Sequence, residues 1–236
     1  MFNLDISIMS VTPDKYAPIG DPTVGYPQLC IRTNRTAERT NLDEVIKILD
    51  AAADQYPIHE KEKRAKVVME ALVTIFSSGN LGHAWIIIFN SDQKGDYTSY
   101  AYHGDHGFVK NADSEEINDS PERKFYIQRC IRLTNPEHCP DKLEQTIIPS
   151  LNRKSYLMAK LMGMTVKNPA NGAYTPINNC TWFAGELWNS ITDEQLIYEQ
   201  AFNGAAHAEK WGIDYLALIT KIADPGMLAE SLSKIK

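Results

Sequence analysis

One cysteine, Cys180, is predicted to lie where the chain passes from a loop into a helix. Asn178 and Asn179 precede it and are residue types that commonly cap a first helical turn, while Pro176 favours an extended approach. The unpaired backbone N–H groups of a first turn and the positive end of the helix dipole stabilise a thiolate, so they lower the pKa of a cysteine at that place. The pattern therefore makes Cys180 a candidate for a reactive cysteine.

The same cysteine also fits the buried face of a helix. The apolar residues that share its helical spacing are Phe183, Ala184, Leu187, Trp188 and Ile191. Cysteine is among the most frequently buried residue types, so this stripe alone also allows Cys180 to be part of the core. A histidine beside the sulfur would separate the two interpretations, because a thiol needs a base to act as a nucleophile.

A candidate histidine stands at the start of a predicted β-hairpin. Residues 81–90 are β-branched and aromatic, a polar connection with one glycine follows, and residues 97–104 are rich in tyrosine. If the two arms pair as antiparallel strands, His83 lies opposite His103 or Gly104. We expect His83 and His103 to be neighbours. Without Cys180 nearby, His83 would be interpreted as an ordinary histidine at a strand edge.

These motifs and their order resemble a known family. A Gly-His-Ala-Trp strand start around His83, a hairpin, a long middle segment and then Tyr-x-Pro-x-Asn-Asn-Cys-Thr at 174–181 are similar to the circularly permuted, NlpC-like branch of the papain-like cysteine hydrolases. In that branch the histidine strand precedes the cysteine helix, as it does here. The resemblance spans about residues 82–191. It implies Cys180 as the nucleophile, His83 as its general base, and a polar orienting residue on the following strand, a position that His103 matches.

A cysteine hydrolase also needs N–H donors where an oxyanion forms. The backbone N–H of Cys180 is the first donor that we expect. A side-chain amide of Asn178 or Asn179 is the expected second donor, unless it is used to cap the helix. Two adjacent asparagines can divide these tasks.

A metal site is the main chemical alternative. His103, Asp105 and His106 in one segment, and residues 137–139 in another, offer the nitrogen, oxygen and sulfur ligands that zinc accepts. Neither segment has the paired Cys-x-x-Cys or His-Glu-x-x-His spacing, so no metal is expected. The sequence contains no Gly-x-Ser-x-Gly elbow and no phosphate-binding glycine loop, so neither a serine hydrolase nor a nucleotide cofactor is expected.

Composition limits the possible partners. The 236 residues are 43% hydrophobic, which is enough for one domain with a substantial core. The net charge is −6 and no run of lysine or arginine is long enough to follow a phosphate backbone, so nucleic acid is not an expected partner. No apolar run reaches membrane-spanning length, so no transmembrane segment is expected.

The amino-terminal residues and the cysteines bear on the compartment. The first ten residues lack the basic region and apolar core of a signal peptide, so we expect a chain made in the cytoplasm. The four cysteines, Cys30, Cys130, Cys139 and Cys180, are few and scattered. They are expected to be reduced thiols rather than a disulfide framework.

The pattern of elements predicts an α+β fold with a small antiparallel sheet packed against the cysteine helix and additional N- and C-terminal helices. The resemblance implies that this fold is of the permuted papain-like, NlpC-like type. We expect one domain over residues 1–236. Its core covers about residues 81–191, with helical additions at 40–80 and 192–236.

Several further elements are predicted around this core. Alternating apolar residues at 2–8 predict an opening strand, and residues 124–133 predict a strand after an exposed loop at 110–123. Residues 140–162 have a helical pattern that Pro149 is expected to interrupt.

Capping patterns define other predicted helices. A capping pair, Asn41 and Glu44, begins a helix that Pro57 follows, and a second helix covers about residues 60–78. Thr192 is expected to cap another helix. Residues 196–222 are expected to be largely helical with a break near Asn203 and Gly204, and a last short helix is expected after residues 224–226.

The leading functional hypothesis is hydrolysis of an amide bond through a thioester on Cys180. The resemblance further implies a peptidoglycan peptide as substrate, and an antibacterial toxin that a type VI secretion machine delivers to the periplasm of a target cell, with a cognate immunity protein as partner. One alternative keeps the fold but acts on a lipid or protein as an acyltransferase, esterase, protease or deamidase. A lipid-acting version needs an apolar cleft and membrane contact, and no basic amphipathic helix is predicted. The other alternative is a binding module with Cys180 in its core.

Overall fold

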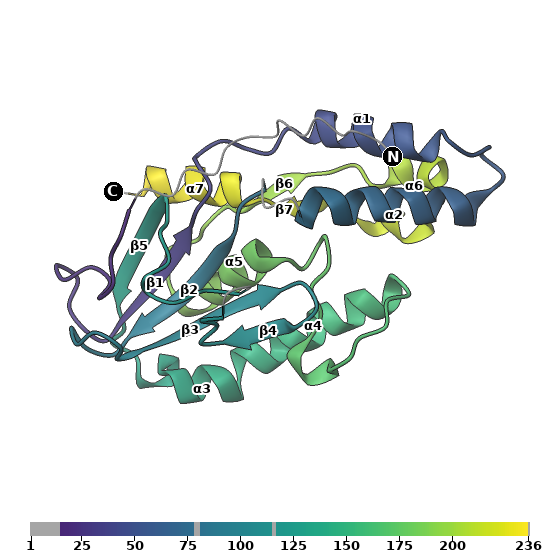
Figure 1. Ribbon diagram of the computed structural model, residues 1–236. Coiled ribbons are helices and arrows are strands. Elements are labelled where there is room, and N and C mark those ends of the chain that lie inside the picture. The colour runs from purple at the N-terminus through teal and green to yellow at the C-terminus, as the bar shows by residue number, and fades with distance from the viewer. Residues whose placement is uncertain (1–14, 78–80, 115–116, 236) are drawn as a thin grey trace.

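A five-stranded antiparallel sheet carries the candidate site in the computed structural model (Figure 1), which describes residues 15–77, 81–114 and 117–235. In spatial order the strands are β4 (Gly107–Lys110), β3 (Tyr97–His103), β2 (Ala84–Phe89), β1 (Gln28–Thr33) and β5 (Ile127–Arg132). Every residue of β1 and β2 is buried. Because β2 is covered on both faces, its sequence is a continuous apolar run rather than an alternating one.

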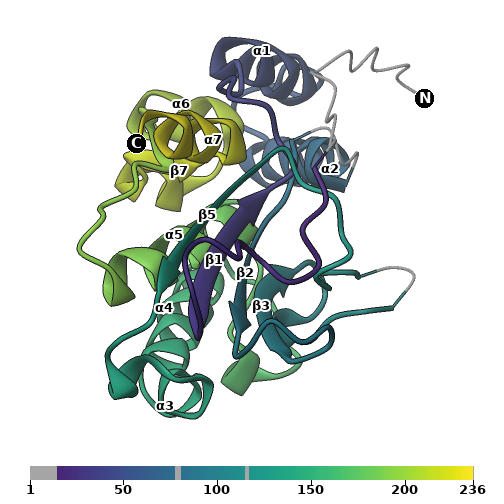
Figure 2. The same cartoon turned by 90° about the vertical axis from the view of Figure 1, so that its left-hand side faces the viewer.

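Helices cover one face of the sheet (Figures 1 and 2). The helix that begins at the cysteine, α5 (Cys180–Ile191), packs against β2 and β3, and α7 (Pro225–Lys234) packs against β5 and β1. Helices α3 (Pro140–Gln145) and α4 (Ile147–Leu161) follow β5 in the chain, and α4 packs against α5. The rings of Tyr102 and Phe183 stack at 4.6 Å between sheet and helix, in the largest buried apolar cluster.

A second group of helices lies at one end of the molecule. In Figure 1, α1 (Leu42–Ala53), α2 (Lys61–Ser77) and α6 (Ala205–Trp211) gather away from strands β3 and β4. With a 3₁₀ turn, η3 (Asp214–Leu218), they share a separate apolar cluster that includes Leu49, Val68 and Trp211. Two short antiparallel strands flank α6 and η3 in the chain: β6 (Glu199–Ala201) comes before them and β7 (Lys221–Ala223) comes after them.

The α+β class and several elements predicted from the sequence are confirmed. The two arms of the hairpin pair as predicted, with Ile86 opposite Tyr100. Helix α1 begins at the predicted cap, where the Asn41 side chain accepts the Glu44 N–H. Helix α5 begins at Cys180. In the described part of the chain, no helix has the length and apolar character needed to cross a membrane.

The structure corrects the predicted break at Pro149. The break lies at Thr146, and Pro149 stands in the first turn of α4. A proline is tolerated there because the first N–H groups of a helix have no intrahelical partner.

The carboxyl-terminal prediction is also wrong. Thr192 ends α5, because its backbone is extended and its N–H still bonds Trp188 O, and no helix starts there. Residues 196–222 form β6, α6, η3 and β7, so they are much less helical than predicted, although a break does lie near Asn203 and Gly204 and a last helix, α7, follows. Strand β1 lies in a stretch for which the sequence indicated no element, whereas the predicted strand at 2–8 lies outside the described residues.

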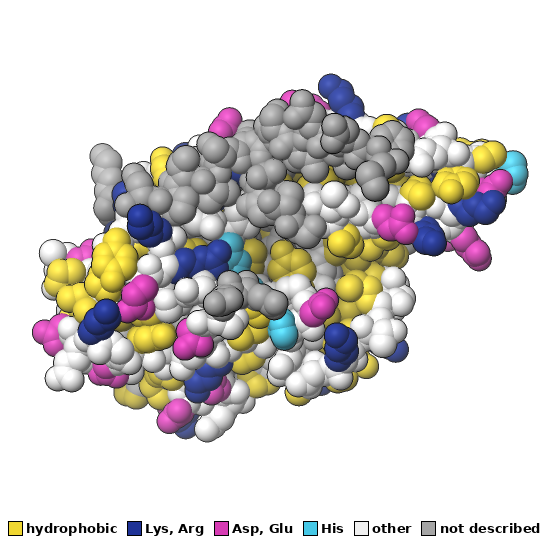
Figure 3. All heavy atoms as spheres, in the orientation of Figure 1, with side chains coloured by type: hydrophobic (Ala, Val, Ile, Leu, Met, Phe, Trp, Pro, Cys, Tyr) yellow, Lys and Arg dark blue, Asp and Glu magenta, His cyan; other side chains and the backbone are white. Residues whose placement is uncertain are grey.

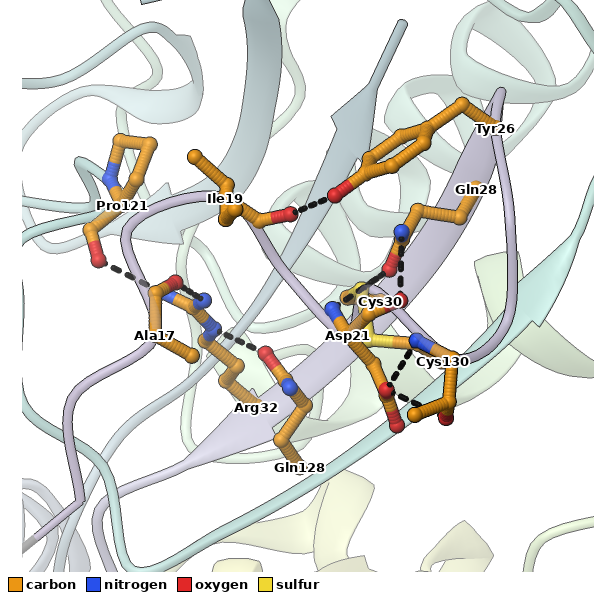
Figure 4. Close-up of a disulfide and its surroundings, with 11 residues drawn as sticks. Ala17, Ile19, Asp21, Tyr26, Gln28, Cys30, Arg32, Pro121, Gln128 and Cys130 are labelled. Atoms are coloured by element: carbon orange, nitrogen blue, oxygen red, sulfur yellow. Dashed lines mark hydrogen bonds between the residues drawn. A yellow bond between two sulfur atoms is a disulfide. The ribbon is translucent and has the colours of Figure 1, made fainter. Parts of the chain in front are cut away.

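The expectation of four reduced cysteines is wrong for one pair. Cys30 and Cys130 form a disulfide, and the free cysteines are Cys139 and Cys180. The pair is separated by 100 residues, but antiparallel pairing of β1 and β5 places the two residues opposite each other with Cα atoms 4.1 Å apart (Figure 4). Spacing along the chain therefore could not reveal this partnership.

We expect the double substitution Cys30→Ser and Cys130→Ser to lower the free energy of unfolding by about 2–4 kcal/mol, since the bridge restricts the unfolded chain. Urea unfolding followed by tryptophan fluorescence measures this change. The control is Cys139→Ser, because Cys139 is exposed and unpaired. Equal unfolding midpoints for the double variant and the control would contradict a stabilising bridge.

Candidate active site

Cys180 is the first residue of α5, and the asparagine before it caps the helix. The Asn179 Oδ1 accepts the backbone N–H groups of Thr181 and Trp182, each at 3.0 Å, and its Nδ2 donates to Ala223 O at 3.0 Å. Asn179 is therefore occupied by capping. The Cys180 side chain lies at the positive end of the helix dipole with only 4% of the residue exposed.

Asn178 is the other asparagine predicted as an oxyanion donor, and it takes no part in this cap. Its backbone N–H donates to Thr175 Oγ1 at 2.8 Å, and it is buried. Among the described residues, no group forms a hydrogen bond with its buried Oδ1. The role of Asn178 at an oxyanion stays a prediction.

His83 lies immediately before β2 and is fixed by its backbone. Its N–H donates to Asn34 Oδ1 at 2.7 Å and its carbonyl accepts the Asn34 N–H at 3.1 Å. Gly82 has φ of +88°, in the left-handed region, and a Cβ there would meet Arg35 Cβ at 2.9 Å. Glycine thus permits the turn that delivers His83 to the sheet.

The hairpin register brings the two predicted histidines together. The rings of His83 and His103 are 4.8 Å apart, and the His83 ring also stacks on Trp85 at 5.5 Å. However, the two histidines do not bond each other directly, because a carboxylate lies between their Nε2 atoms. The His83 Nε2 lies 2.7 Å from Asp119 Oδ1, whereas His103 Nε2 contacts Asp119 Oδ2.

Asp119, rather than His103, therefore makes the direct hydrogen bond to the His83 ring that was expected of the orienting residue. The carboxylate is 1% exposed and also receives the Arg123 guanidinium at 3.0 Å. It comes from the segment between β4 and β5 that was expected to be an exposed loop. Asp105 and Asp113 are exposed, and nothing in their local sequence distinguishes them from Asp119. The direct contact with His83 exists because the loop folds inward.

A fully buried arginine ties this loop to the centre of the sheet (Figure 4). Arg32, on β1, donates to Pro121 O at 2.9 Å and to Gln128 Oε1 at 2.8 Å, and it also contacts Ala17 O. Its guanidinium lies 4.5 Å from the Phe125 ring centroid. Because Pro121 is two residues after Asp119, these contacts position the carboxylate as well as the loop.

The site favours a thiolate next to an imidazolium. Burial would lower the pKa of His83, but the negative charges of Asp119 and Cys180 outweigh it and raise this pKa to about 9. Burial would raise the pKa of Cys180, but the charge and hydrogen bond of His83 and the backbone N–H of Ala84 lower it below its ordinary value. Each partner stabilises the charged form of the other.

The pKa values of Asp119 and His103 are also shifted by their neighbours. Burial opposes ionisation of Asp119, but the charges and hydrogen bonds of His83 and His103 hold its pKa well below its ordinary value. Burial and the charge of His83 lower the pKa of His103 despite its hydrogen bond to Asp119. A neutral His103 then donates from Nε2 to the carboxylate.

Two hydroxyl groups also face the sulfur. Thr181 Oγ1 lies 4.0 Å from Cys180 Sγ. The Tyr174 hydroxyl interacts with Cys180, and burial together with the charge of the thiolate raises the pKa of Tyr174 well above its ordinary value. Tyr174 therefore stays protonated and can donate to negative charge that develops beside the sulfur.

Ligand atoms of His83, His103 and Asp119 lie within 4.8 Å of one another, which is the one converging set of metal-ligand types found among the described residues. Arg123 places a positive charge on the same carboxylate, which opposes a second cation there. The predicted alternative ligands Asp105 and His106 are exposed in the turn between β3 and β4. The geometry fits acid–base chemistry better than metal binding.

Comparison with known proteins gives no match: no family model, no curated protein and no solved structure matches this chain. The interpretation of the site therefore depends on its residues and their geometry.

We expect iodoacetamide to label Cys180 in the native Cys139→Ser protein well below pH 8, because the thiolate is already formed there. His83→Ala should slow this labelling at least tenfold at pH 7, since the thiol loses its imidazolium partner. Intact-protein mass spectrometry measures the rates. Labelling that occurs only in denaturant would show that Cys180 is simply a core residue.

Proposed function

We propose that the protein is a cysteine hydrolase of the permuted papain-like type, which cleaves a carbonyl–heteroatom bond through a thioester. The observation that carries this proposal is the continuous line of contacts from Cys180 through His83 to the buried Asp119. A core cysteine needs no such partners. The order of the elements, with the histidine before β2 and the cysteine at the start of α5, supports the permuted arrangement.

The residues supply each step of the reaction. The Cys180 thiolate attacks the carbonyl carbon, and the backbone N–H of Cys180 and the Tyr174 hydroxyl stabilise the developing oxyanion. The His83 imidazolium gives its proton to the leaving group as the carbon–heteroatom bond breaks. His83 then accepts a proton from water, which attacks the thioester and releases the acid. Asp119 keeps the His83 ring oriented throughout.

On the basis of the resemblance to the permuted NlpC-like hydrolases, we propose an amide of a peptidoglycan peptide as the substrate. The protein would then act as an antibacterial toxin. In this proposal a type VI secretion machine delivers it to the target periplasm, and an immunity protein blocks the site in the producing cell. The Cys30–Cys130 bridge supports action outside a reducing cytosol, because disulfides persist in oxidising compartments. The same catalytic residues would also serve an acyltransferase, esterase, protease or deamidase.

We expect hydrolysis to show a bell-shaped pH profile, because the reactive pair needs a deprotonated Cys180 and a protonated His83. Activity should fall as the pH rises through about 9, the pKa of His83, and as it falls below the lowered pKa of Cys180. Asp119→Asn removes a negative charge, so the alkaline limb should move toward neutral pH and kcat should fall about 10²-fold. Initial rates with a chromogenic ester measure both effects.

Asp113→Asn is the matched control for this experiment, since it removes an exposed carboxylate from the same segment. Its profile should match that of the unsubstituted protein. An alkaline limb that stays in place in Asp119→Asn would refute the assignment of Asp119.

If the substrate is a peptidoglycan peptide of the cell wall (a wall peptide), the toxicity of the protein should depend on the compartment in which it is expressed. Expression with an added export leader should lyse cells, whereas cytosolic expression should not, because only the periplasm contains the wall. Growth and release of a cytosolic marker measure lysis, with Cys180→Ala as the inactive control. Equal toxicity from both compartments would rule out the wall peptide as the target.

A further inference from the structure

An apolar cavity of about 100 Å³ leads to the candidate nucleophile. Its walls come from α1 and α2 on one side, from α6, η3 and β7 on another, and from the segment before α5. Cys180, Tyr174 and Gly82 are among the lining residues. On the face shown in Figure 3, hydrophobic side chains gather in the hollow between α2 and α4.

The lining offers little to a charged ligand. Among the described lining residues there is no lysine, arginine, histidine or glutamate, and the one acidic residue is Asp224. The Asp224 carboxylate is already used: it accepts the backbone N–H and hydroxyl of Thr40, a hydrogen bond from Gln200 and the Gly226 N–H. A charged group placed in this cavity would lose its hydration without gaining an oppositely charged partner.

The volume of the cavity limits the length of a hydrocarbon chain that could fill it. A cavity of this size has room for roughly seven to ten water-sized groups, and a methylene group is of similar size. A straight chain of about six to ten carbons would therefore fill it.

A second groove, of about 680 Å³, shares Tyr174 with the cavity, although Cys180 does not line it. Its lining is different in character, since it includes Asp105, His106, Lys110 and Lys167. Tyr174 lines both spaces. A carbonyl beside Cys180 and Tyr174 would thus have an apolar side, toward the cavity, and a polar side, toward the groove.

We propose that Cys180 takes an acyl group whose medium-length hydrocarbon chain fills the apolar cavity while the polar leaving group lies in the groove. The inference rests on the proposed cysteine chemistry and replaces the wall peptide with a different substrate class. A wall peptide carries carboxylates and amides throughout, and the described part of the cavity lining has no lysine, arginine or histidine to pair with a carboxylate.

The covalent steps balance without a further reactant. The Cys180 sulfur forms a bond to the acyl carbon, the bond from that carbon to the leaving oxygen or nitrogen breaks, and His83 protonates the leaving group. Water then gives a proton to His83 and forms a new carbon–oxygen bond, and the carbon–sulfur bond breaks with its electron pair staying on sulfur. The products are a carboxylic acid and the original Cys180 thiolate beside a protonated His83. No oxidant, reductant or metal takes part.

The chain-length test uses p-nitrophenyl acetate, butyrate, hexanoate and octanoate, each below its solubility limit. Each added methylene that enters the cavity should raise kcat/KM up to about fourfold, because its burial removes apolar surface from water. Intact-protein mass should show an octanoyl group on the protein but not on Cys180→Ala. A flat series would overturn the proposal.

A substitution within the cavity tests where the chain lies. Ile46, on α1, lines the cavity, so Ile46→Trp should abolish the preference for octanoate over acetate while acetate still reacts. Val73→Trp is the matched control, because Val73 lies on α2 with 63% of its surface exposed and is not a lining residue. If Ile46→Trp keeps the chain-length preference, the chain binds elsewhere and the inference fails.

Two further measurements separate the possible failures and the source of the chain. If iodoacetamide labels Cys180 at neutral pH but the ester series is flat, the acyl inference fails and the cysteine hydrolase remains. If neither reagent reacts, the proposed function fails as well. Dioctanoyl phosphatidylcholine, presented as monomers and as micelles, then tests a lipid source. Hydrolysis of the soluble octanoate ester without hydrolysis of this lipid would assign a soluble acyl donor.

Discussion

The buried negative charge of Asp119 is the constraint on which the site depends. A carboxylate that is 1% exposed is costly unless positive and hydrogen-bonding groups compensate for its lost hydration. Here His83, His103 and Arg123 all reach its two oxygens. The negative charge of this carboxylate raises the pKa of His83, because an imidazolium beside it is more stable than a neutral imidazole.

That constraint explains features that lie well away from the sulfur. In the described part of the Asp119 loop, the local backbone pairing includes only an isolated bridge between Asp113 and Asn118, so long-range contacts help to hold its position. Arg32 supplies them from the centre of the sheet, with hydrogen bonds to Pro121 and to Gln128. Arg32 is itself fully buried and reaches carbonyl and amide oxygens rather than a carboxylate. The sheet therefore holds the loop without neutralising the charge that His83 needs.

The parts of the site that the sequence predicts are those with local signals. Asn179 and Cys180 follow a capping pattern, and His83 with His103 follows from the length of one hairpin. Asp119 has no such signal, because its burial depends on partners from other strands and from the histidines. Strand β1 was missed for a related reason: Gln28 and Arg32 look unfavourable for a central strand, yet both are buried with hydrogen-bond partners.

The carboxyl-terminal elements show how tertiary contacts override a helical pattern. At Gly204 the chain packs against its own later segment, and a Cβ there would lie 2.1 Å from Leu216 O. The Gly204 N–H bonds Ile219 O, so the residues after it fold back instead of extending as a helix. This return path closes one wall of the cavity beside Cys180. The fold therefore places the nucleophile at the boundary between two apolar clusters, where the charged pair faces the sheet and the apolar cavity faces the helices.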